Sequence, residues 1–223
     1  AAFPPYGSNL TYPVGAYTRC HQTSGTHGAP MRWLDTPESW SAMTDAWVEV
    51  LKQAGVGPGD RAFFPFSFGP FLGFWLAFEA AQRLGVLSVS GGGMSSVLRL
   101  RVLIEQGFTV MCCTPTYALH LAEAARVEGL DLSRSRVRRI IVAGEPGGSL
   151  PGVRARLEEA WPGAKVYDHY GMTEVGPVAF AKEGMDGALR VLEERYYVEV
   201  LTPGGDEPVP EWHIGELVLT PLG

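Results

Sequence analysis

Cysteine is scarce in this chain of 223 residues, which contains only Cys20, Cys112 and Cys113. An odd number with one adjacent pair excludes the disulfide framework that staples small secreted domains. The sequence has no Cys-x-x-Cys spacing, and Cys112 and Cys113 fall in a predicted buried strand, so a zinc site is not expected either. Free thiols indicate a reducing compartment, and we therefore expect a cytoplasmic protein.

An excess of positive charge and a long apolar run are also lacking. The chain has 18 Lys and Arg against 24 Asp and Glu, a formal net charge of −6. This balance argues against nucleic acid as a partner, because the phosphate backbone selects basic surfaces. The uncharged run 62–78 is interrupted by proline and glycine and is shorter than the ~20 residues of a spanning helix, so no membrane contact is expected. We also expect no signal peptide, because the first residues lack a basic stretch followed by an apolar one.

Apolar residues are abundant, at 46%, and they alternate between strand and helix patterns through the middle of the chain. Long helices between short apolar strands imply right-handed crossovers, and they predict an α/β fold with a largely parallel sheet and flanking helices. Thr36 and Pro37 mark the start of the first helix and Gly55 its end. The expected strands are 62–66, 86–89, 109–113, 139–143 and 164–168, and the further expected helices are 70–84, 95–106, 117–128 and 150–160.

After Glu174 the pattern changes to short strands joined by turns, at 178–180, 189–192, 197–201 and 216–220. This change predicts a small antiparallel β region. We therefore expect the core of a large α/β domain in residues 1–188 and the start of a small β subdomain in 189–223.

Four glycine- or hydroxyl-bearing loops each follow a predicted strand, at 67–69, 90–93, 144–148 and 170–174. Ligands of open α/β sheets bind in the crevice outside the carboxyl ends of the strands. The four loops together therefore indicate a single binding site at this edge of the sheet.

The segment 23–30 is suited to phosphate, because its glycines permit positive φ angles and its hydroxyls can bond phosphate oxygens. It is not a Walker A loop, since no Gly-Lys-Ser/Thr follows. A polar turn between two strands is the alternative interpretation. The candidate phosphate-binding residues are Thr23, Ser24, Gly25, Thr26 and Gly28.

The segment 170–176 carries an aromatic ring, a hydroxyl and a carboxylate. Tyr170 can stack on adenine, Thr173 can donate to a phosphate, and Glu174 can bind Mg²⁺. The alternatives are a half-buried tyrosine at the edge of the sheet and a solvated glutamate after a turn. Likewise, the loop 144–148 either lines a nucleotide or ends a strand.

Aromatic residues cluster around the predicted crevice, and most are expected in the core. Phe66 and Phe68 are the ones we expect to wall a flat apolar pocket. His169 can touch a ligand, although a histidine in a strand is more often structural.

Taken together and in this order, these motifs resemble the acyl- and aryl-adenylating enzymes, and most closely their phenylacetate–coenzyme A ligase branch. The resemblance implies the N-terminal domain fold of that family. It also implies ATP-dependent activation of an aromatic acid to an acyl-adenylate, release of pyrophosphate, and transfer to coenzyme A with release of AMP. The segments that carry the resemblance are 23–30, 66–69, 91–93, 113–117, 144–146, 170–174 and 215–217.

The resemblance also assigns roles to residues. Thr173 and Glu174 become catalytic, with Glu174 the ligand of Mg²⁺, and no covalent nucleophile is needed. The acid pocket consists of Phe66, Phe68, Gly69, Gly91, Gly92 and Gly93. The nucleotide site consists of Thr23, Ser24, Gly25, Thr26, Gly28, Gly144, Glu145, Pro146, Asp168, His169, Tyr170, Gly171, Met172 and Thr173. A homodimer is compatible with the family.

Three departures from the family pattern change the expectation. Ala29 occupies the place of a lysine or arginine, which predicts weaker pyrophosphate binding unless Arg32 compensates. The chain stops at Gly223, before the arginine–aspartate segment and the small C-terminal domain, and it begins without the family's upstream helical segment. We therefore expect the central part of a larger enzyme, poorly active on its own.

Two other functions remain open at this point. An adenylating enzyme can pass the acyl group to a carrier protein or an amine instead of coenzyme A. A non-catalytic nucleotide-binding module is the alternative from another class. The sequence does not choose among aromatic acids.

Overall fold

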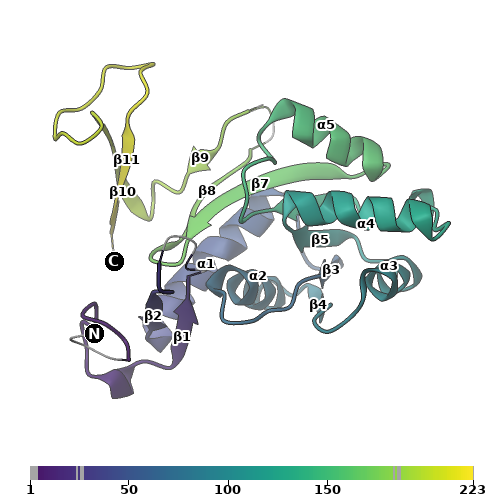
Figure 1. Ribbon diagram of the computed structural model, residues 1–223, viewed down its shortest axis with the longest axis horizontal. Helices are drawn as coiled ribbons and strands as arrows, with labels where there is room; N and C mark the ends of the chain where they lie inside the picture. Colours follow the sequence, from purple (N-terminus) through teal and green to yellow (C-terminus); the bar gives the residue numbers. More distant parts are fainter. Residues whose placement is uncertain (1–4, 24, 26–27, 183, 185–186, 223) are drawn as a thin grey trace. The chain divides into compact units, whose positions relative to one another are not determined.

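The computed structural model describes residues 5–23, 25, 28–182, 184 and 187–222 (Figure 1). The chain divides into two compact units, Ala1–Arg190 and Val191–Gly223. They are treated separately below.

The main sheet confirms the predicted α/β class with a largely parallel sheet. Its strand order is β4-β3-β5-β6-β7-β8-β9 (Figure 1). The first five strands in this order are parallel, and β8 returns antiparallel to β7. The strands are β3 (Arg61–Phe64), β4 (Leu87–Ser90), β5 (Val110–Cys113), β6 (Arg139–Val142), β7 (Lys165–Met172), β8 (Gly176–Phe180) and β9 (Arg190–Val191).

Helices flank this sheet. The buried cluster on one face joins residues of α3, α4 and α5 to alternate residues of the strands, among them Phe63, Met111 and Ile140. On the other side α1 contacts α2 and β8, and α2 contacts β3 and β4. The helices are α1 (Pro37–Gln53), α2 (Leu72–Arg83), α3 (Ser96–Glu105), α4 (Pro115–Val127) and α5 (Pro151–Ala160), with short 3-10 turns η1 (Val14–Ala16) and η2 (Leu132–Arg134).

Side-chain caps fix where several helices begin. The Thr36 hydroxyl accepts from the Ser39 amide at the start of α1, as predicted. The helix predicted at 117–128 begins two residues earlier, because Thr114 caps it and Pro115 fills its first position.

One predicted boundary was wrong at the site itself. The strand expected at 164–168 continues as β7 to Met172, so residues 170–172 belong to a strand and not to a loop. The extension exists because β8 pairs with it, with a register shift between Tyr170 and Gly171. The turn that remains spans 173–175, and it holds Thr173 and Glu174.

An antiparallel hairpin precedes the main sheet. Its strands are β1 (Arg19–Gln22) and β2 (Arg32–Asp35), paired from Arg19↔Asp35 to Gln22↔Arg32. The segment 23–30 connects them, so the candidate phosphate loop is the tip of this hairpin.

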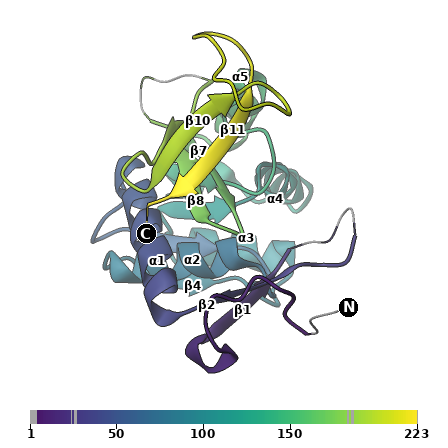
Figure 2. The same ribbon diagram turned by 90° about the vertical axis from the view of Figure 1, so that its left-hand side faces the viewer.

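The second unit is an antiparallel pair, β10 (Tyr196–Leu201) and β11 (Glu216–Pro221), which run side by side in Figure 2. It agrees with the predicted antiparallel β region. In the described part of the chain, none of the helices combines the length and the apolar character needed to cross a membrane.

The loop between β6 and α5 packs against β7 so closely that it requires glycine at 148. An added Cβ would lie 2.4 Å from Val142 Cγ2 and 2.7 Å from Asp168 Cγ. We expect Gly148→Ala to lower the free energy of unfolding by about 1–3 kcal/mol through overpacking. Urea denaturation measures this.

The matched control is Gly152→Ala, four residues along in α5, where an added Cβ meets nothing within 4 Å. This variant should be neutral or more stable by about 0.5–1 kcal/mol, because glycine disfavours helix. Equal effects of the two substitutions would contradict the tight packing at Gly148.

Candidate active site

A cavity of about 510 Å³ lies at the carboxyl ends of the parallel strands. Its wall begins at Gln22 and Thr23, where β1 ends. It continues along α1 and α2 and then passes the ends of β5, β6 and β7 to the 173–175 turn. The lining residues are Gln22, Thr23, Trp47, Phe66, Phe71, Leu72, Gly73, Phe74, Cys112, Cys113, Thr114, Ala143, Gly144, His169, Gly171, Met172, Thr173, Glu174 and Gly176.

Several residues predicted from separate loops meet in this wall. They are Thr23, Phe66, Gly144, His169, Gly171, Met172, Thr173 and Glu174. Phe68 and Gly69 line an adjoining cavity of about 330 Å³ instead. Predicted residues that line neither of these two cavities are Gly25, Gly28, Gly91, Gly92, Gly93, Glu145, Pro146, Asp168 and Tyr170. Ser24 and Thr26 lie outside the described residues.

Two predicted site residues, Asp168 and Glu145, make hydrogen bonds that hold the loops around the cavity in place. The Asp168 carboxylate accepts from the Ser149 amide at 2.6 Å and from the His169 amide at 3.0 Å. The Glu145 carboxylate accepts from the Thr116 hydroxyl at 2.7 and 2.8 Å. These bonds fix the loop 144–148 to β7 and to the start of α4. Tyr170, by contrast, is 42% exposed, so its ring face is available for stacking.

The Gly91–Gly93 segment packs against the end of β3 instead of a cavity wall. A Cβ at Gly91 would lie 2.9 Å from Phe63 Cζ and 3.0 Å from Pro65 Cα. This glycine therefore permits a close approach between two strand ends.

The loop after β3 that carries Phe66 and Phe68, which we call the aromatic loop, contains one residue with a strained backbone. Phe68 has φ +62, a region that non-glycine residues seldom adopt. Its ring packs against Trp75 and Phe78 at centroid distances of 4.9 and 5.3 Å, and the Trp75 indole donates to the Gly69 carbonyl at 2.9 Å. Packing and this hydrogen bond keep the strained Phe68 in place beside the cavities. Strained residues cluster at the functional sites of proteins.

The turn at 173–175 suits a magnesium ion that arrives with phosphate. Thr173 and Glu174 both line the larger cavity, and none of the hydrogen bonds or ion pairs within the described residues engages the Glu174 carboxylate. The described residues hold no cluster of three or more His, Cys, Asp and Glu side chains. A lone carboxylate fits Mg²⁺, which keeps several waters and phosphate oxygens as ligands.

His169 is an unpaired polar group in the cavity wall. It is 6% exposed, its ring centroid lies 4.1 Å from that of Trp47, and neither ring nitrogen has a hydrogen-bond partner among the residues that the structure describes. Burial lowers the pKa of His169 from 6.5 to about 3, so the imidazole is neutral at pH 7.

The two thiols of the wall are also neutral. Burial raises the pKa of Cys112 to about 12 and raises that of Cys113 well above its usual range. Because only the thiolate is a strong nucleophile, Cys112 and Cys113 act here as small apolar residues.

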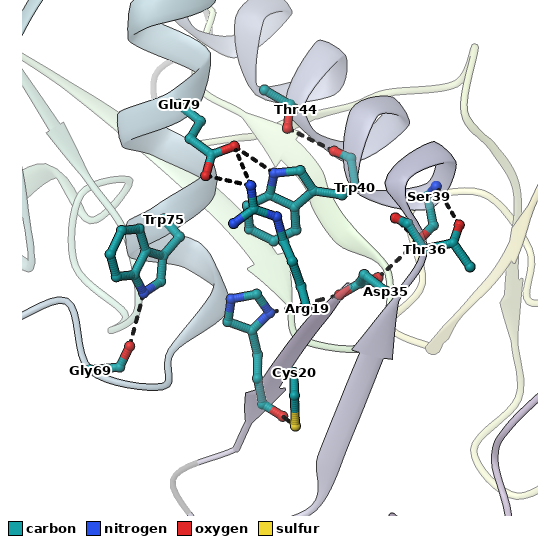
Figure 3. Close-up of polar contacts among 11 residues, drawn as sticks. Arg19, Cys20, Asp35, Thr36, Ser39, Trp40, Thr44, Gly69, Trp75 and Glu79 are labelled. Atoms are coloured by element: carbon teal, nitrogen blue, oxygen red, sulfur yellow. Dashed lines mark hydrogen bonds and ion pairs between the residues drawn. The ribbon is translucent and has the colours of Figure 1, made fainter. Parts of the chain in front are cut away.

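The hairpin that presents the phosphate loop is tied to α1 and α2 by a charged network (Figure 3). Arg19 lies over the Trp40 ring at 4.2 Å and pairs with Glu79 at 2.9 Å. Trp40 Nε1 donates to the same carboxylate at 2.7 Å, and His21 stacks on Trp40 at 5.0 Å. Glu79 thus neutralises the arginine that holds β1 in place.

The candidate phosphate loop leaves no room for a side chain at Gly25. Gly25 has φ +69, and a Cβ there would lie 2.9 Å from the Gly28 carbonyl oxygen and from Pro30. Arg32, which we considered as a substitute for the missing cation at 29, donates to the Pro5 carbonyl. The role of Arg32 toward phosphate therefore stays a prediction.

The sequence did not identify several wall residues. Trp47 lies on the first predicted helix, and Phe71 and Phe74 belong to the aromatic residues expected around the crevice and mostly in the core; all three line the cavity. α1 and α2 reach this edge of the sheet only because of the order of the strands, which the local sequence pattern does not show. Arg99 and Tyr117, which line the smaller cavity, carried no signal beyond the resemblance of the 113–117 segment.

Removal of the Glu79 charge should loosen the hairpin. In Glu79→Gln the partly buried Arg19 loses its ion pair, and we expect a loss of about 1 kcal/mol in the free energy of unfolding. Chemical denaturation followed by fluorescence measures it. Glu123→Gln is the control, because its pair with Arg126 at 2.6 Å is largely exposed and should contribute nothing measurable. A similar loss in both variants would contradict the anchoring role.

Burial of His169 should make the fold sensitive to acid. The folded-state pKa lies below the ordinary value of 6.5, so the unfolded chain takes up this proton first and stability falls as pH drops from 6.5 toward 3. His169→Phe should reduce this slope by up to about 1.4 kcal/mol per pH unit. Denaturation at several pH values measures the slope, with the exposed His213→Gln as control. An unchanged slope in His169→Phe would contradict the burial effect.

Comparisons with known proteins show which proteins the chain is similar to. The family model described as AMP-binding enzyme matches residues 22–220. The phenylacetate–coenzyme A ligase of Pseudomonas putida is 28% identical over 235 residues, covering 100% of this chain and 53% of that protein. The Thermus thermophilus enzyme of the same name is 29% identical, covering 95% and 49%. The chain thus spans about half the length of these relatives.

A solved structure is also similar over nearly the whole chain. It is a 2-hydroxyisobutyryl-CoA ligase in complex with 2-HIB-AMP and CoA, in the thioesterification state. The TM-score is 0.91 at 31% identity, covering 99% of this chain and 47% of that one.

Proposed function

The chain belongs to the AMP-binding enzyme family, and from this premise we propose that the protein activates a carboxylic acid with ATP and passes it to coenzyme A. The products are a thioester, AMP and pyrophosphate. Residues 1–188 supply the core of the large domain and 189–223 the start of a small β subdomain. Because the chain spans about half of its relatives, this activity is assigned to the protein at its natural length, and the chain alone is expected to be poorly active.

One observation carries the proposal: Thr23, Thr173 and Glu174 line the same cavity as a large apolar wall. Adenylation needs phosphate ligands and an acid pocket within one site, because the acid must be aligned with the α-phosphate. Thr23, next to the end of β1, and Thr173 and Glu174 of the 173–175 turn give such a pocket polar groups, which supports the proposal.

In the first half-reaction a carboxylate oxygen of the acid attacks the α-phosphorus. The new bond joins that oxygen to phosphorus, and the bond to the bridging oxygen breaks, so pyrophosphate leaves with the electron pair. Thr23 and the backbone of its loop orient the phosphates, and Thr173 donates to one of them. Glu174 holds the metal ion, which when bound offsets phosphate charge.

In the second half-reaction the thiol of coenzyme A displaces AMP from the acyl carbon. The apolar walls keep water from the adenylate, which would otherwise hydrolyse. Neutral Cys112 and Cys113 do not compete as nucleophiles, since burial keeps their pKa high. Tyr170 offers its ring to adenine.

The proposed acid is aromatic. Trp47, Phe66, Phe71 and Phe74 give the cavity a flat apolar wall, which favours a ring. The phenylacetate–coenzyme A ligases among the relatives support this choice. The 2-hydroxyisobutyryl-CoA ligase similarity makes a small hydroxy acid the second candidate.

Two accompanying proposals and two alternatives go with this function. Free thiols favour the cytoplasm, and a homodimer is compatible with the family. Transfer to a carrier protein or an amine in place of coenzyme A would keep the first half-reaction unchanged. Nucleotide binding without chemistry is the alternative that Ala29 favours.

The test is acid-dependent ATP–pyrophosphate exchange by the protein at its natural length, with a panel of aromatic, small hydroxy and aliphatic acids. Exchange that requires an acid supports adenylation and ranks the substrates. A folded protein that binds ATP without any exchange would favour the non-catalytic alternative.

Glu174→Gln should reduce the exchange rate at least 100-fold, because a metal ligand that stabilises phosphate charge is lost. Glu105→Gln, at an exposed position on α3, is the control and should keep the parent rate. Unchanged exchange in Glu174→Gln would remove this residue from the metal site.

A further inference from the structure

A buried cation lines the smaller cavity without an anionic partner. Arg99, on α3, is 8% exposed. Its Nε donates to the Gly91 carbonyl at 2.9 Å and its Nη1 to the Tyr117 hydroxyl at 2.6 Å. None of the ion pairs within the described residues involves it, and both of its partners are neutral oxygens.

This arrangement is costly without a ligand. Arginine stays charged at every physiological pH, and a buried charge without a counter-charge is strongly unfavourable. The ring of Tyr117, 5.3 Å from the guanidinium carbon, offsets only a small part of this cost. The Nη2 donors have no hydrogen-bond partner among the described residues, so the fork is open to an incoming acceptor.

The cavity beside Arg99 is lined mostly by apolar residues, with the hydroxyl-bearing Ser67, Thr114 and Tyr117 among them, and adjoins the proposed reaction site. Its volume is about 330 Å³, and its wall includes Pro65 and Phe68. It shares five lining residues with the larger cavity, namely Phe66, Phe71, Phe74, Cys113 and Thr114. Phe71 is the exposed ring among the shared phenylalanines, at 39%. A ligand that enters the larger cavity therefore has an aromatic path toward Arg99.

We propose that Arg99 recognises a second anionic oxygen group on the acid substrate, at the end remote from the carboxylate that reacts. The ligand class is an aromatic dicarboxylate or an acid of equivalent charge. The inference rests on the proposed function and deepens it. The reacting carboxylate lies near Thr173 and Glu174, the ring lies along the phenylalanine wall, and the second carboxylate meets the guanidinium fork.

Chemistry favours a carboxylate over a neutral group at this position. The planar fork of arginine matches two carboxylate oxygens at once. A neutral acceptor would leave the buried charge uncompensated, whereas a carboxylate neutralises it. Because the walls exclude water, the pair gains specificity against acids that end in a methyl group.

The test compares matched acids in ATP–pyrophosphate exchange by the protein at its natural length. Terephthalate and 4-carboxyphenylacetate are compared with 4-methylbenzoate and 4-methylphenylacetate. The parent protein should prefer the dicarboxylates. In Arg99→Met the value of kcat/KM for the dicarboxylates should fall about 10- to 100-fold, whereas that for the methyl acids should stay unchanged or rise. Arg99→Lys should retain part of the preference.

Arg101→Met is the control on the same helix, at an exposed position, and should leave all rates unchanged. A parent protein that prefers the methyl acids, or an Arg99→Met variant that loses activity equally with every acid, would overturn the proposal. The second result would mean that Arg99 only supports the Gly91 segment and Tyr117.

Calorimetric titration separates this proposal from the failure of the proposed function. If no acid supports exchange, terephthalate binding that is present in the parent and lost in Arg99→Met would still support the anion site. Absence of terephthalate binding would overturn it. Arg99-dependent binding of inorganic phosphate but not terephthalate would also overturn it, and would assign the site to a phosphate of a co-substrate.

Discussion

The arrangement of the site depends on the hydrogen bonds of Asp168, because they join three elements at the end of the parallel sheet. Its carboxylate accepts from the Ser149 and His169 amides, and its carbonyl accepts from the Ala181 amide at 2.7 Å. The first bond holds the loop that leads to α5, and the last holds the strand that returns beside β7. A buried carboxylate satisfied by backbone N–H groups gives a rigid joint. From this joint β7 extends to the turn that carries Thr173 and Glu174.

Two buried polar side chains that line the cavities have bonding capacity left over, whereas almost all buried polar groups in proteins are paired. His169 has no partner on either ring nitrogen, and Arg99 has no counter-charge among the described residues. Both line cavities, whereas other buried polar groups, such as Thr44 and Asp168, are bonded within the fold. Unpaired buried atoms also occur at His21 and Asp35, which line neither cavity, so a ligand in the cavities would meet only the imidazole of His169 and the open donors of Arg99.

The order of strands and helices was predictable from the sequence, because short apolar strands and capped amphipathic helices follow local rules. Thr36 and Pro37 predicted the start of α1 in this way. The extension of β7 to Met172 was not predictable, since it depends on pairing with β8. The hairpin β1–β2 carried no alternating apolar pattern, because Arg19 and Gln22 are polar. Of the four loops predicted to meet in one site, the segment at Gly91–Gly93 lines neither cavity and residues 170–172 belong to β7. Trp47 and Arg99 reach the cavity walls only through tertiary packing of α1 and α3, which no local pattern encodes.

The hairpin tip and the aromatic loop are also joined directly, and this contact links the two halves of the site. The Gln22 amide donates to the Pro70 carbonyl at 2.9 Å, immediately beside Thr23 on one side and Gly69 on the other. Glu79 and Trp40 hold the base of the same hairpin, and Trp75 of the same helix as Glu79 holds Gly69. The phosphate loop and the aromatic wall therefore share one support, the helix α2. In-line attack requires the acid and the α-phosphate to be aligned within fractions of an ångström. For the proposed reaction a common support would favour that alignment, because the candidate phosphate hairpin and the aromatic loop are both held by α2.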